Sequence, residues 1–82
     1  MNNKELVLNA IIKAFQSKKN VLDMMDEVNP EMLKMDEILF SEIMFSLQKE
    51  GLISGVMFEN DNPQQITLWD TVRVNTTNYK VK

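Results

Sequence analysis

Residues 40–56 have the sequence Phe40-Ser-Glu-Ile-Met-Phe-Ser-Leu-Gln-Lys-Glu-Gly-Leu-Ile-Ser-Gly-Val56. Apolar side chains recur in its first part at helical spacing, which predicts a single buried helix face. Gly51 then supplies the left-handed backbone conformation that commonly ends a helix. Leu52, Ile53, Val56 and Phe58 continue with the content of a strand. The stretch therefore predicts a helix that stops at a glycine and is followed directly by a strand.

This central helix is expected to run from about Glu37 to Glu50, because Asp36 is a favourable cap. An earlier helix is expected over about 3–16, where a broad apolar stripe follows Asn2 and Asn3. The central helix therefore has a sequence signal at each end, Asp36 at its start and Gly51 at its stop.

Between these two helices the sequence is less regular. Asn29-Pro30 predicts a short helix, with Asn29 as cap and Pro30 at the first helical position. The side chains expected to point inward from it are Met32, Leu33 and Met35. In residues 17–29, Val21-Leu22 fits a short strand, whereas Leu22, Met25 and Val28 fit one helix face, and both alternatives stay open.

After the glycine, residues 52–59 and 64–69 are expected to pair as antiparallel strands around the turn Asn60-Asp-Asn-Pro63. Residues 70–82 fit a final strand, a short helix or a loosely held end. The 82 residues are expected to form one domain, 1–82.

Several segments resemble the YjcQ-like winged-helix family of small proteins from phages and prophages of Gram-positive bacteria. They are Leu33-Lys-Met-Asp36, Phe40, the run from Leu47 to Val56, and Ala10-Ile11-Ile12-Lys13 in the first helix. The resemblance implies an α+β fold: a small winged helix-turn-helix domain with three helices and a two- or three-stranded antiparallel wing. It brings no catalytic residue with it. The chain departs from the family in its long 17–29 segment and in lacking the usual final helix, of which residues 72–79 are a faint echo.

Composition restricts the chemistry available to the chain. It contains no cysteine and no histidine, which removes disulfides, thiol nucleophiles and the commonest general base. We therefore expect a protein that is not an enzyme and that holds no metal or cofactor. No apolar run is long enough for a membrane span and no signal peptide is evident, so the expected partners exclude the membrane and the expected location is cytoplasmic.

Charge is distributed in three blocks. Residues 1–20 hold four lysines and one glutamate (+3), residues 21–61 hold ten acids and two lysines (−8), and residues 62–82 hold three bases and one aspartate (+2). Together they give the net charge of −3. The acidic block covers the helix and strands that a winged helix would present to DNA, whereas phosphate binding requires basic groups there.

On a helical wheel, Ile38 and Phe45 lie nearly opposite the core face of the central helix. One interpretation is that helix 1, residues 17–29 or the tail cover them. The other is an exposed patch that binds a partner, with these candidate residues: Ile38, Glu42, Phe45, Lys49 and Trp69. Trp69 is expected either to pack over the sheet edge or to anchor an interface.

Two charged faces are also candidates. The acidic face comprises Asp23, Asp26, Glu27, Glu31, Asp36 and Glu37, and it fits either a solvated surface or a mimic of DNA phosphates. The basic face comprises Lys4, Lys13, Lys18, Lys19, Arg73, Lys80 and Lys82, which would converge if the two termini are close.

These patterns favour a non-enzymatic binding module that acts through protein–protein contacts, with a protein partner or a second copy of the chain. A DNA-binding transcriptional regulator is the first alternative, although the acidic central helix disfavours nucleic acid. An acidic DNA mimic that inhibits a host nucleic-acid-binding protein is the second alternative.

Overall fold

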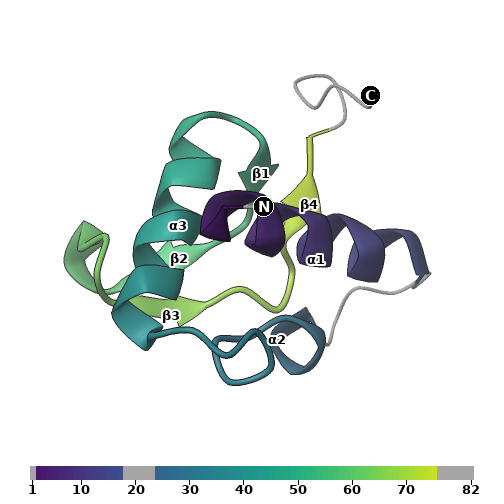
Figure 1. Cartoon of the computed structure of the whole chain (residues 1–82). Coiled ribbons are helices and arrows are strands. Elements are labelled where there is room, and N and C mark those ends of the chain that lie inside the picture. The colour runs from purple at the N-terminus through teal and green to yellow at the C-terminus, as the bar shows by residue number, and fades with distance from the viewer. Residues whose placement is uncertain (1, 18–23, 76–82) are drawn as a thin grey trace.

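The computed structural model describes residues 2–17 and 24–75. The described helices are α1 (Asn3–Ser17), α2 (Met24–Glu27) and α3 (Glu37–Lys49), and the described strands are β1 (Ile53–Ser54), β2 (Met57–Phe58), β3 (Ile66–Leu68) and β4 (Arg73–Val74), with a 3₁₀ turn at Glu59–Asp61. Three helices and two antiparallel two-stranded sheets make the α+β, winged-helix-like domain that the sequence predicted (Figure 1).

Both ends of α3 follow the predicted signals. The Asp36 carboxylate accepts hydrogen bonds from the backbone N–H groups of Ile38 and Leu39, at 3.0 and 3.2 Å. At the other end, Gly51 has φ 78°, and its N–H donates to the carbonyl of Gln48 at 3.0 Å. These bonds satisfy backbone groups that a helix leaves without partners at its ends. The cap at residue 36 and the stop at residue 51 are therefore confirmed.

The short helix predicted to start at Asn29-Pro30 was wrong, because the structure has a turn over residues 30–34 instead. Asn29 does accept the N–H of Met32 at 2.8 Å, but the segment closes after a single turn. Lys34 adopts a left-handed conformation with φ 54°, and the N–H of Met35 bonds to the carbonyl of Pro30 at 2.9 Å. This early stop leaves Met32 59% exposed, which corrects the expectation that it points inward.

In the preceding segment, the described part is a helix. Met24 and Val28 are buried and Met25 is half-buried, as the helix alternative expected for residues 25 and 28. Val21 and Leu22, on which the strand alternative depended, lie outside the described residues.

The single strand expected over residues 52–59 is divided by Gly55. Gly55 has φ 88°, and a Cβ there would lie 2.8 Å from the carbonyl oxygen of Thr71. As a result, β1 pairs with β4 (Ile53 opposite Val74), while β2 pairs with β3 (Met57 opposite Leu68). The beginning of the tail is therefore a strand, and residues 76–82 lie outside the described residues.

The core lies where α1 crosses α3 and both face the strands (Figure 1). Its buried apolar side chains come from every helix and from the strands and loops that follow α3: Val7, Ile11, Ala14, Met24, Val28, Phe40, Ile43, Met44, Leu47, Ile53, Val56, Trp69 and Val72. Burial of this set is the main favourable contribution to folding.

Two polar side chains of α3 hold the wing, which consists of β2, the 3₁₀ turn and β3. The buried hydroxyl of Ser41 donates to the carbonyl of Pro63 at 2.7 Å and accepts the N–H of Ile66 at 2.9 Å. The amide of Gln48 accepts the N–H of Val56 at 2.8 Å and donates to the carbonyl of the same residue at 3.1 Å. The Ser41 bonds therefore set where β3 lies relative to α3. The Gln48 bonds set where the segment between β1 and β2 lies relative to the same helix.

Candidate functional site

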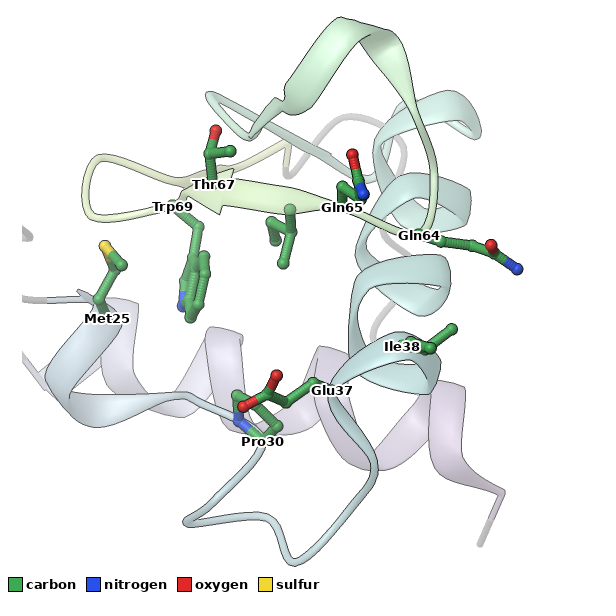
Figure 2. Close-up of a pocket in the computed structure, with 9 residues that line it drawn as sticks. Met25, Pro30, Glu37, Ile38, Gln64, Gln65, Thr67 and Trp69 are labelled. Carbon is green, nitrogen blue, oxygen red and sulfur yellow. The ribbon is translucent and has the colours of Figure 1, made fainter.

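A groove of about 480 Å³ opens between the start of α3, the segment after α2 and strand β3. On the strand side it is lined by Gln64, Gln65, Ile66, Thr67 and Trp69. On the helix side it is lined by Met25, Pro30, Glu37 and Ile38. Figure 2 shows Met25 at one end, Trp69 in the middle, and Ile38 with Gln64 at the other end.

The wall of the groove at Trp69 is held from two directions. The indole N–H donates to the carbonyl of Val28 at 2.7 Å, and the ring lies 5.2 Å from the ring of Phe40, tilted by 57°. Only 8% of the residue is exposed. The tryptophan is therefore a packed, fixed wall, as the packing alternative expected, and not a projecting anchor.

Ile38 gives the groove its most exposed apolar side chain. It lies in the first turn of α3, where its backbone N–H is bound by Asp36, yet 50% of the residue is exposed. Because removing apolar surface from water is favourable, a partner that covers the Ile38 side chain would bind more tightly.

Polar and acidic groups surround this apolar lining. The Gln64 amide donates to the carboxylate of Glu42 at 3.1 Å, which links that acid to the groove. A second hollow of about 440 Å³ shares Pro30, Glu37 and Trp69 and reaches Glu31. Among the described residues, the linings of the two hollows include carboxylates but no lysine or arginine.

The predicted partner surface is not one patch. Ile38 and Trp69 line the groove, and Glu42 adjoins it through Gln64. Phe45 is half-buried, with its ring 5.2 Å from that of Phe58 on β2 in an edge-to-face contact, so the wing covers it. Lys49 is exposed at the opposite end of α3, about 16 Å along the axis from Ile38.

The acidic face is partly assembled. Five of its acids are exposed on α2, in the following turn, at the cap of α3 and in its first turn: Asp26, Glu27, Glu31, Asp36 and Glu37. Of these, Glu37 lines the groove and Glu31 the second hollow. Asp23 lies outside the described residues. The carboxylate of Asp36 serves as the helix cap.

Three of the seven candidates for the basic face lie in the described residues: Lys4, Lys13 and Arg73. Lys4 pairs with Glu50, and this ammonium, together with the Ser46 hydroxyl, holds the pKa of the Glu50 carboxyl below its ordinary value. Lys13 is exposed on α1 and Arg73 is exposed on β4, and these two elements contact each other. Lys18, Lys19, Lys80 and Lys82 lie outside the described residues.

Sequence reasoning missed most of the groove lining. Pro30 was identified only as a helix start, and Gln64, Gln65 and Thr67 only as parts of a strand. Pro30 becomes a lining residue because the turn that follows α2 faces these three side chains across the groove. Gln64, Gln65 and Thr67 become lining residues because Ser41 positions the wing against α3. A single buried serine in an apolar face carries this information, and it leaves no periodic signal.

Neither a metal-binding group of side chains nor a membrane-spanning helix is found in the described residues. Within 2–17 and 24–75, no group of three or more acidic, cysteine or histidine side chains is arranged to hold a metal ion. In the same residues, no helix is both long and apolar enough to cross a membrane.

Comparison with known families gives one match, to a family model described as YjcQ protein, over residues 6–80. Neither the curated proteins nor the solved structures gave a match.

Proposed function

The chain belongs to the YjcQ family, and from that premise we propose that it is a non-enzymatic winged-helix binding module that acts through contacts with another protein. We propose the cytoplasm as its place of action. The observation that carries the proposal is the groove at the start of α3, where half-exposed Ile38 lies among acidic and amide side chains.

The position of this groove supports a protein partner over DNA. In helix-turn-helix proteins the N-terminal residues of the recognition helix contact base edges. Here the corresponding turn presents Glu37 and Ile38, followed by Glu42. Carboxylates at this position repel the phosphate backbone, and an aliphatic side chain offers no hydrogen bond to the bases.

The acidic surroundings continue beyond the helix. Asp26 and Glu31 lie on the elements that precede α3, and Glu59 and Asp61 lie at the tip of the wing. Both parts of a winged helix that commonly approach a duplex are therefore negatively charged in the described residues. Of the exposed bases in the described residues, Lys13 and Arg73 lie on α1 and β4, Lys34 lies in the turn before α3, and Lys49 lies at the C-terminal end of α3, away from its first turn.

The experiment that tests this proposal is a titration of the full chain with labelled random duplex DNA at physiological salt, followed by fluorescence anisotropy. We expect a Kd weaker than about 10⁻⁴ M, at the weak edge of ordinary non-specific binding. Micromolar binding that falls steeply with salt would favour a DNA-binding regulator instead.

A further inference from the structure

We propose that the groove beside Trp69 binds a basic segment of a partner protein, in which lysine or arginine residues flank one aliphatic side chain. This rests on the proposed function, because it names the chemistry of the partner for the same site. Three features of the described residues carry it: an apolar lining, an acidic surround and a rigid wall.

The apolar lining fixes the need for an aliphatic anchor. Met25, Ile66 and Trp69 line the groove together with Ile38, which is 50% exposed. A purely polar segment would leave these surfaces in contact with water and gain nothing from them. One aliphatic side chain placed between Trp69 and Ile38 would cover both.

The charges select a basic segment over a neutral or acidic one. Glu37 lines the main groove and Glu31 the hollow next to it, and Glu42 is held at the rim by Gln64. Lys34 lies between Glu31 and Glu37 in the sequence, in the turn between α2 and α3, but it lines neither hollow. Charge complementarity across an interface speeds association and disfavours partners of the wrong sign.

The wall is already in its binding position. Trp69 is bonded to Val28 and contacts Phe40, while Ser41 holds strand β3, which carries the lining next to Trp69. A preformed site spends little free energy on ordering itself when a ligand binds. The sole tryptophan of the chain also lies in this wall, so its emission reports occupancy directly.

The test uses the full chain and three synthetic peptides that differ only in chemistry. The first carries lysines around one central leucine, the second replaces the leucine by serine, and the third replaces the lysines by glutamates. Binding is followed by Trp69 fluorescence, and amide chemical-shift mapping locates it. We expect the first peptide to bind with shifts at Gln64–Thr67 and Ile38, and the other two to bind at least about tenfold more weakly.

Matched variants separate the groove from the rest of the surface. Ile38→Ser should weaken the first peptide about five- to tenfold, whereas Met57→Ser, an equally exposed apolar residue on the wing, should change nothing. Glu37→Gln should weaken it a few-fold, whereas Glu59→Gln at the wing tip should leave it unchanged. Circular dichroism confirms that each variant is folded.

Equal binding of all three peptides, or shifts that map to α1 and β4, would overturn the inference while leaving a protein-binding function intact. Self-association through the groove, lost in Ile38→Ser by sedimentation, would assign the site to a second copy and also overturn it. Failure of the proposed function is a separate result, since it appears as tight duplex binding in the DNA titration.

Discussion

The two ends of α3 differ in how completely they are packed. At the C-terminal end, Leu47 is buried, Gln48 binds both backbone groups of Val56, and Gly51 closes the helix. At the N-terminal end, the backbone is capped by Asp36 but the side chain of Ile38 is half in water beside a groove. One helix thus combines an end that stabilises the fold with an end that is free to bind.

Under the proposed function, this difference places stability and binding at opposite ends of one helix. Leu47, Gln48 and Gly51 contribute to folding through burial and satisfied hydrogen bonds, so changes there should unfold the chain. The side chain of Ile38 contributes little to folding because half of it already contacts water. Changes there should alter binding while the fold survives.

The largest expected effect is at the packed end. Leu47→Ala should lower the free energy of unfolding by about 2–5 kcal/mol, because the fully buried Leu47 side chain is replaced in part by a cavity. Ile38→Ala is the matched control at the open end and should cost less than about 0.5 kcal/mol beyond its propensity effect. Urea unfolding followed by circular dichroism measures both, and equal losses would remove the distinction between the two ends.

The next effect concerns the break between β1 and β2. Gly55→Ala should cost more than Gly51→Ala, which carries a penalty of about 1–2 kcal/mol for a left-handed alanine. The additional cost arises because a Cβ at residue 55 meets the Thr71 carbonyl at 2.8 Å. Thermal unfolding of the pair would contradict this if the variant at residue 51 were the less stable one.

A smaller loss is expected for the amide that joins α3 to the wing. Gln48→Ala removes both hydrogen bonds to Val56 and should cost about 1–3 kcal/mol, since the part-buried backbone groups lose their partner. Gln64→Ala removes an exposed bond to Glu42 at the open end and should cost under about 0.5 kcal/mol. Chemical denaturation decides it, and a neutral Gln48→Ala would show that water replaces the amide.

The smallest effect depends on pH. The pKa of Glu50 is held below its ordinary value of 4.5 by Lys4 and Ser46, so its stabilising contribution is present above that value. The contribution is lost as pH falls through the lowered pKa of the folded state. Glu50→Gln should therefore flatten the acid limb of the stability curve slightly, measured as Tm against pH, and an unchanged curve would mean that the exposed pair contributes nothing.

The sequence predicted the bounds of α3 and its core face well because their signals are local. Asp36 caps the helix within three residues, Gly51 ends it, and the spacing of Phe40, Ile43 and Leu47 identifies the core face. Each of these rules acts within one or two turns of the same helix. The α+β class and the family followed from them.

The open end was predicted less well because long-range contacts form it. Phe45 was expected either to lie exposed with Ile38 or to be covered by helix 1, residues 17–29 or the tail, whereas in the structure Phe58 covers it from the wing. Trp69 became a buried wall because its indole reaches the carbonyl of Val28, 41 residues earlier. Neither contact leaves a periodic trace in the sequence, so the covering of Phe45 and the groove wall at Trp69 became visible only in the structure.

The most direct test of a protein partner reached through the open end of α3 is an affinity capture with three baits. The wild type, Ile38→Ser and Met57→Ser are immobilised and exposed to nuclease-treated lysate of the source organism, and retained proteins are quantified by mass spectrometry. We predict a protein retained equally by the wild type and Met57→Ser and about five- to tenfold less by Ile38→Ser. The same retention by all three baits, or retention that is seen only in a parallel lysate left without nuclease, would contradict a protein-binding surface at this end of the helix.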